Sequence, residues 1–155
     1  MNGTTARRRI VVGSDGSESS RAALRWALRQ AALVGAAVEA VTAWEYPASH
    51  GLVPATVDGD AEALAGKVLA ETVAREWGLD RLVEVRERVA PGNAARVLLT
   101  VAEGAELLVV GNRGHGGFTG AVLGSVTQHC VQHASCPVVV VREAGRAKAE
   151  PGDGR

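Results

Sequence analysis

The chain has 155 residues, of which 46% are hydrophobic and 22% charged, so it is long and apolar enough to form one domain with a substantial core. Seventeen basic residues balance seventeen acidic ones, and the only tight basic run is Arg7-Arg8-Arg9, which disfavours a nucleic-acid partner. No apolar stretch approaches the roughly 18–20 residues that span a bilayer, and two cysteines do not make a disulfide scaffold. We therefore expect a cytoplasmic protein with no membrane contact.

Along the first half of the chain, short β-branched runs alternate with segments of helical periodicity. The run Ile10-Val11-Val12 ends in a turn, and Ser17 or Ser19 can cap the helix that follows. Two prolines and two glycines interrupt the pattern between Tyr46 and Gly59, which predicts a long loop. The elements expected here are a strand at 9–13, a helix ending at Gly35, a strand at 37–44, the loop at 46–59 and a helix from about 64 to Gly78.

The second half continues the alternation of strands and helices. Charged residues alternate with valines at 83, 85 and 89, as in a strand with one exposed face, and Asn93 is placed to cap the next helix. The elements expected here are a strand at 82–89, a helix around 97–101, a strand at 106–111, a helix ending near Ala134 and a strand at 137–141. Residues 1–7 and 143–155 are expected to be flexible tails on a single domain at 8–142.

Strands that alternate with helices pair in parallel through right-handed crossovers. This pattern predicts an α/β fold with a doubly wound, five-stranded parallel sheet and helices on both faces. Ligands of such sheets bind beyond the carboxyl ends of the strands, where the strand order reverses. The first and fourth expected strands end in the two most glycine-dense turns of the chain, so we expect the binding site there.

The segment between Gly111 and Ser125 carries most of the chemical information. Its glycines, among them Gly114, Gly116 and Gly117, can adopt φ > 0, and their N–H groups can form an anion-binding concavity. Ser125 and the start of the following helix add a hydroxyl and a favourable dipole for a phosphate. The segment is not a Walker A loop, because no Gly-Lys-Ser/Thr occurs. It is not the dinucleotide-binding fingerprint either, because that motif follows the first strand. The alternative interpretation is that this segment binds no ligand and is a flexible loop whose glycines let a helix pack closely against a strand.

The spacing G-x2-G-x9-G-S, realised by Gly111, Gly114, Gly124 and Ser125, resembles the ATP-binding signature of the universal stress protein family. The resemblance extends over about residues 8–142 as a single copy. Three further segments resemble the family, namely the first strand with its Asp-bearing turn (10–17), the end of the third strand (89–92) and the closing helix–strand junction (133–141).

The resemblance implies a Rossmann-like sheet of the adenine nucleotide alpha hydrolase-like kind, with strand order 3-2-1-4-5 and ATP between the first and fourth strand ends. Mg2+ is expected with ATP, because Arg113 is the only evident cation near the phosphates. Asn112 stands where the family often has serine. The implied ligand-binding residues are Gly13, Ser14 and Asp15 on the ribose and adenine side, Ala43 beside adenine, Gly111, Arg113 and Gly114 at the phosphates, and Gly124, Ser125 and Val126 completing the phosphate cradle.

Several residues also have a plainer interpretation. Asp15 could cap the first helix or stabilise its turn, and Arg113 could be a solvated side chain. His115 is interpreted as an exposed loop histidine and not as a catalytic base. The last group, His129, Cys130, His133 and Cys136, has the composition of a metal site, but Cys136 precedes Pro137 and lies past the helix, so no metal site is predicted.

The resemblance implies a non-enzymatic regulator of the stress response, whose ATP-bound state acts through an unknown protein partner or a second copy. One alternative is a weak ATPase or phosphotransferase, although the sequence shows no pre-placed general base, and slow hydrolysis stays open. The other alternative is a dimeric interaction module that binds no nucleotide.

The two expected edge strands differ in charge. The third strand carries Glu84, Arg86 and Arg88, whereas the fifth is uncharged and β-branched. An uncharged edge of this kind needs a cover, and the same strand of a second copy can supply it about a two-fold axis. We therefore predict a homodimer through the last strand, at Val138, Val139, Val140 and Val141.

Overall fold

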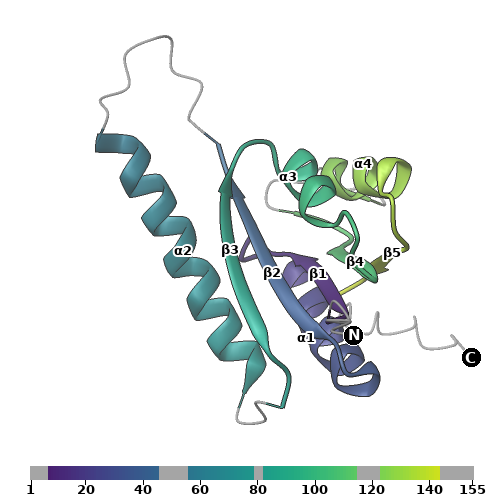
Figure 1. The fold of residues 1–155 in the computed structure, drawn as a ribbon. Coiled ribbons are helices and arrows are strands. Elements are labelled where there is room, and N and C mark those ends of the chain that lie inside the picture. Colours follow the sequence, from purple (N-terminus) through teal and green to yellow (C-terminus); the bar gives the residue numbers. More distant parts are fainter. Residues whose placement is uncertain (1–6, 46–55, 79–81, 115–122, 144–155) are drawn as a thin grey trace, which may run out of the picture.

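The computed structural model describes residues 7–45, 56–78, 82–114 and 123–143; most of the two expected tails, His115 and much of the expected loop lie outside the described residues. Strands and helices alternate along the chain (Figure 1). The elements are β1 (Arg9–Gly13), α1 (Glu18–Val34), β2 (Ala37–Trp44), α2 (Thr56–Trp77), β3 (Val85–Pro91), α3 (Ala94–Val101), β4 (Leu107–Gly111), α4 (Ser125–His133) and β5 (Val138–Val141).

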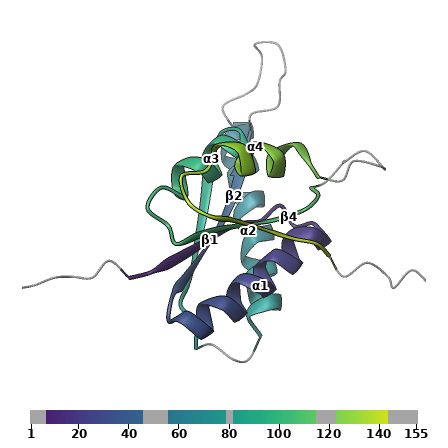
Figure 2. The same ribbon diagram turned by 90° about the vertical axis from the view of Figure 1, so that its right-hand side faces the viewer.

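The five strands form one parallel sheet in the order β3-β2-β1-β4-β5. Helices α1 and α2 cover one face, and α3 and α4 cover the other (Figures 1 and 2). The expected doubly wound α/β fold and its strand order are confirmed. Within the described ranges, no helix is both long and apolar enough to cross a bilayer.

The core lies in two layers on either side of β1. Ile10 and Val12 face the layer of α1 and α2, while Val11 faces the layer of α3 and α4, and all three are fully buried. A β-branched run without alternation is what a strand buried on both faces requires. The strand order reverses between β1 and β4, and the central residues of both strands are buried.

Side-chain caps fix the starts of α1 and α3. Ser17, and not Ser19, caps α1, because the Ser17 hydroxyl accepts a hydrogen bond from the Ser20 N–H. Asn93 caps α3 as expected, by accepting from the Arg96 N–H. Both helices begin at the carboxyl edge of the sheet, so the caps define where the chain leaves that edge.

Two expected boundaries are wrong. Helix α2 begins at Thr56 and includes Gly59, since a single glycine costs a helix only about 1 kcal/mol and the good helix formers at 61–65 follow it. Strand β3 runs from Val85 to Pro91 instead of 82–89, because its pairing with β2 extends as far as Trp44. Valine alternation marks one face of a strand but not where its partner begins and ends.

A charged group joins three strands across the sheet. The carboxylate of Glu39 on β2, with a side chain only 8% exposed, lies 3.2 Å from Arg9 Nη1 and 2.9 Å from Arg88 Nε. Arg9 Nη1 also donates to the Val101 carbonyl, 2.6 Å away at the end of α3. These contacts tie α3 to β1 and β2, and α3 forms one wall of the site described next.

Candidate functional site

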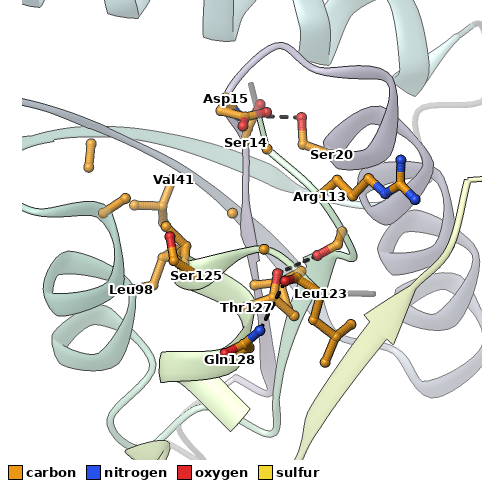
Figure 3. Close-up of a pocket in the computed structure, with 18 residues that line it drawn as sticks. Ser14, Asp15, Ser20, Val41, Leu98, Arg113, Leu123, Ser125, Thr127 and Gln128 are labelled. Atoms are coloured by element: carbon orange, nitrogen blue, oxygen red, sulfur yellow. Dashed lines mark hydrogen bonds between the residues drawn. The ribbon is translucent and has the colours of Figure 1, made fainter. Parts of the chain in front are cut away.

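A cavity of about 520 Å3 opens beyond the carboxyl ends of β1, β2 and β4, between those ends and the starts of α3 and α4 (Figure 3). It lies where the strand order reverses. All ten residues named from the sequence line it, namely Gly13, Ser14, Asp15, Ala43, Gly111, Arg113, Gly114, Gly124, Ser125 and Val126. Eight further residues that the sequence did not indicate also line it, namely Ser20, Val41, Ala94, Leu98, Val110, Leu123, Thr127 and Gln128.

An apolar surface lines the part of the cavity nearest the sheet. Val41 and Val110 come from β2 and β4, Leu98 comes from α3, and the three belong to one buried cluster. Val41 could have been found from the sequence, because it lies two residues before Ala43 and so shares its face of the strand. Leu98 could not, since nothing in the sequence tells which turn of α3 crosses the strand ends.

Ser14 is held at the end of β1 by its backbone. Its N–H donates to the Val41 carbonyl at 2.8 Å, and its carbonyl accepts from the Thr42 hydroxyl at 2.8 Å. The Ser14 Oγ is buried and has no hydrogen-bond partner within the described part of the chain. A buried hydroxyl without a partner beside a cavity is available to a ligand.

Asp15 stabilises the turn and also faces the glycine-rich segment. Its Oδ1 accepts from the Ser17 N–H at 2.9 Å and from the Ser17 hydroxyl, so the plainer interpretation of this residue is correct as far as it goes. Its Oδ2 points at Gly114, where an added Cβ would lie 2.9 Å away. The carboxylate therefore lies across from the residues that the resemblance assigns to phosphate.

Gly111 is a glycine because α1 approaches β4 closely. A Cβ there would lie 2.2 Å from Ser19 Oγ and 2.7 Å from the Ser19 backbone carbonyl. The Ser19 hydroxyl donates to Asn112 Oδ1 at 2.9 Å and accepts from the Arg113 N–H at 3.2 Å. Ser19 thus fixes the path of the chain as it leaves β4, and Asn112 supplies the acceptor for it.

The expectation of positive φ is wrong for Gly111 and Gly114. Neither adopts a left-handed conformation, whereas Gly16 does, with a φ of 79°. Close packing, and not backbone freedom, explains why a side chain is excluded at 111 and disfavoured at 114. Gly116 and Gly117 lie outside the described residues.

The first turn of α4 presents N–H donors to the cavity. Gly124 is its N-cap and supplies no side-chain hydrogen bond. The first bond within the helix runs from the Gln128 N–H to the Gly124 carbonyl, so the N–H groups of Ser125, Val126 and Thr127 have no acceptor inside the helix. The positive end of the helix dipole adds to these donors, and both features favour an anion at this wall.

Hydrogen bonds hold this start of α4 against β4. The Gly124 N–H donates to the Asn112 carbonyl at 2.8 Å, and the Thr127 hydroxyl donates to the Gly111 carbonyl at 2.6 Å. Gln128 Nε2 donates to the Leu123 carbonyl at 3.0 Å (Figure 3). The donors are therefore positioned before any ligand arrives, which lowers the entropy cost of binding.

Side-chain charge in the cavity is sparse. Among the described residues that line it, Asp15 and Arg113 are the only ionisable ones. Arg113 is exposed, and in Figure 3 its side chain points away from Leu98 and Ser125. Backbone dipoles of α4 are thus the best-placed positive groups, and the cavity suits a ligand with one apolar part and one anionic part.

The four residues with metal-site composition do not converge as one ligand set. Cys130 is fully buried in the layer of α3 and α4, and burial raises the pKa of its thiol to about 11, which disfavours a thiolate ligand. His129 and His133 are exposed, with ring centroids 4.5 Å apart. In the described part of the chain, no three metal-ligating side chains come together.

Comparisons with known proteins agree with this architecture. The model of the universal stress protein family matches residues 6–142. A curated universal stress protein from Mycolicibacterium smegmatis is 34% identical over 142 residues, which cover 85% of this chain and 47% of that protein. Among solved structures, UspA from Lactobacillus plantarum has a TM-score of 0.69 at 23% identity, over 88% of this chain and 99% of that one.

A solved universal stress protein in complex with cAMP is also similar, with a TM-score of 0.64 at 28% identity, over 90% of this chain and 99% of that one. The chain spans about half the length of the curated relatives it matches. It nevertheless spans nearly all of the two solved chains. Since the family model covers most of the sequence, this chain belongs to the universal stress protein family.

Proposed function

We propose that this protein binds ATP, as its Mg2+ complex, in the cavity beyond β1 and β4. One observation carries the proposal. A helix start with three open N–H donors and no side-chain cap faces a cavity that is lined by every described residue of the G-x2-G-x9-G-S pattern. The related protein crystallised with cAMP supports an adenine nucleotide as the ligand class.

The residues present fit the parts of a nucleotide. The base would lie against Val41, Leu98 and Ala43, which offer aliphatic surface and a strand-end backbone. The phosphates would meet the open donors of Ser125 and Val126. The unpartnered Ser14 hydroxyl would complete its hydrogen bonding with the ligand.

A cation is needed because the site provides little side-chain charge of its own. The carboxylate of Asp15 faces Gly114, and a polyphosphate beside it would be repelled without compensation. Mg2+ supplies that compensation, since it prefers phosphate and carboxylate oxygens and keeps several waters. Affinity for ATP should therefore rise with Mg2+.

We propose a regulatory and not a catalytic role for the bound nucleotide. The carboxylate nearest the expected phosphates, that of Asp15, already accepts two hydrogen bonds from Ser17 at one oxygen. It is thus fixed as a structural acceptor of the turn. Nucleotide occupancy would then change contacts with an unidentified protein partner or a second copy, as part of a stress response in the cytoplasm.

The titration of nucleotide-free protein with Mg-ATP tests this proposal. We expect one ATP per chain by calorimetry, with weaker binding when Mg2+ is replaced by a chelator, and AMP and cAMP as comparison ligands. No saturation up to millimolar Mg-ATP would contradict the proposal. Release of phosphate faster than in the protein-free control would favour the ATPase alternative.

We further propose that the second copy pairs through β5. The bonds from the Leu108 N–H to the Pro137 carbonyl and from the Asn112 N–H to the Val141 carbonyl show which backbone groups face β4. By the alternation of a strand, the Val140 amide faces the open edge. A second β5 could therefore accept its N–H.

Val140→Pro removes the outward N–H without adding charge to the layer of α3 and α4, in which the Val140 side chain is partly buried. We expect the parent protein to be a dimer and this variant to be monomeric by light scattering at micromolar concentration. Arg86→Ser, on the opposite edge of the sheet, should leave the dimer unchanged. A monomeric parent protein would contradict pairing through β5.

A further inference from the structure

Helix α4 carries two imidazoles that the nucleotide site does not use. His129 and His133 are separated by one helical turn, and both are exposed. Their ring centroids lie 4.5 Å apart, and the rings are tilted by 44°. Neither residue lines the cavity.

The distance between the rings is the one that a shared metal ion requires. A ring nitrogen bound to a metal at about 2.0–2.1 Å places the ring centroid about 3.2 Å from the ion. Two such rings at ligand angles of about 90–110° have centroids about 4.5–5.2 Å apart. The observed 4.5 Å lies within this range, so the spacing of the two rings allows one nitrogen of each to bind the same ion.

No charged side chain of α4 lies between the two imidazoles and a metal ion. Helix α4 has no lysine, arginine, aspartate or glutamate between Ser125 and His133, so no charged neighbour on the helix competes for either ring. Two imidazoles one turn apart on a helix supply two of the three protein ligands in many zinc enzymes. Cys130 takes no part, because it is buried on the other side of the helix.

We propose that His129 and His133 form a chelating site for one divalent transition-metal ion, with water in the remaining coordination positions. Imidazole suits Cu2+, Ni2+ and Zn2+, whereas Mg2+ prefers oxygen ligands. This site is therefore chemically distinct from the Mg2+ proposed with ATP. It also differs from a closed structural zinc site, since the protein supplies two ligands and not four.

Calorimetric titration of the nucleotide-free full chain with CuCl2, NiCl2 and ZnCl2 tests the proposal. We expect one ion per chain, with Cu2+ bound more tightly than Ni2+ or Zn2+ and with no competition from a large excess of Mg2+. His129→Ala and His133→Ala should each weaken the affinity at least tenfold. Because both side chains are exposed, the fold should persist, which circular dichroism would show.

Matched controls separate this pair from other ligands of the chain. The double variant His50→Ala/His115→Ala removes the other two histidines and should bind as tightly as the parent protein. Two double variants test the spacing. In His133→Gln/Gln132→His, the new histidine lies three residues from His129 on the same helix face, so metal binding should recover. In His133→Gln/Val131→His, the new histidine lies on a different face from His129, so metal binding should stay weak.

Two results would overturn the proposal: equal affinity in the parent protein and both alanine variants, or loss of binding in the control lacking His50 and His115. Mg-ATP titrations of the same variants keep the two sites apart. We expect unchanged ATP affinity in His129→Ala, so failure of the metal site would leave the nucleotide proposal standing, and the reverse also holds.

Discussion

Helices α3 and α4 both begin at the carboxyl edge of the sheet, and they differ in what accepts the hydrogen bonds of their first turns. In α3, Asn93 Oδ1 accepts from the Arg96 N–H at 3.2 Å. In α4, the N-cap is Gly124, which has no side chain to accept anything. One helix start has a side-chain acceptor within the protein, and the other has none in the described part of the chain.

This difference agrees with a structural role for the start of α3 and with the ligand-binding role proposed for the start of α4. A side-chain cap is worth about 0.5–2 kcal/mol to the folded state, and α4 lacks one. The open donors of α4 lie in the wall of the cavity, together with Ser125 and Val126. An anion bound there would supply the acceptors that Asn93 supplies for α3.

The largest expected effect comes from filling the space between α4 and Asp15. Gly114→Val should weaken Mg-ATP binding at least a hundredfold, because even its Cβ would lie 2.9 Å from Asp15 Oδ2 and its methyl groups would enter the cavity. Calorimetry measures the loss, and an unchanged melting temperature would show that the fold is intact. Parent-like affinity would place the phosphates elsewhere.

A large loss of stability is expected when Gly111, at the end of β4, is replaced. Gly111→Ala should lower the free energy of unfolding by about 1–3 kcal/mol, because the new Cβ overlaps the backbone of Ser19. Urea denaturation measures the change. Gly66→Ala is the matched control, since its Cβ would lie 3.8 Å from Val89 and should stabilise α2 or leave it unchanged. Similar stabilities of the two variants would contradict the close approach of α1 and β4.

The smallest effects test the two helix starts directly. Asn93→Ala should lower the free energy of unfolding by about 1 kcal/mol, with ATP affinity within threefold of the parent protein. Gly124→Asn should give α4 an internal acceptor and weaken ATP binding about threefold to tenfold, because that acceptor competes with phosphate. Gly124→Ala adds a Cβ at ordinary contact distances and no acceptor, so it should bind more tightly than Gly124→Asn. Equal affinities of these two variants would contradict the role of the open donors.

Much of the fold followed from local patterns. Buried runs such as Ile10-Val11-Val12 marked central strands, and Asn93 marked the start of α3. The boundaries of α2 and β3 did not follow, because the first turn of α2 contains weak helix formers and a glycine, and because the extent of β3 depends on the length of the partner strand β2. Those are properties of contacts and not of a short sequence window.

The candidate site followed from the resemblance to the universal stress protein family, and all ten residues that it implied line one cavity. What could not be read from the spacing was why each glycine is present. Gly111 is explained by Ser19, which lies 92 positions earlier in the sequence and contacts it only in the folded chain. The same holds for Leu98, whose place in the cavity wall depends on how α3 crosses β2.

The charged group around Glu39 has a consequence for how the sheet finds its alignment. Valine and alanine are the commonest residues of β1 and β2, and a slip of two residues keeps every side chain on its own face of the sheet, so hydrophobicity alone specifies their alignment weakly. Glu39 removes that freedom, because only the alignment that pairs Val11 with Glu39 and Glu39 with Arg86 brings Arg9 and Arg88 to its carboxylate. A slipped sheet would bury an uncompensated negative charge at a cost of several kcal/mol. We infer that this single acidic residue selects one alignment among near-equivalent ones, and that the strand ends meet as they do because of it.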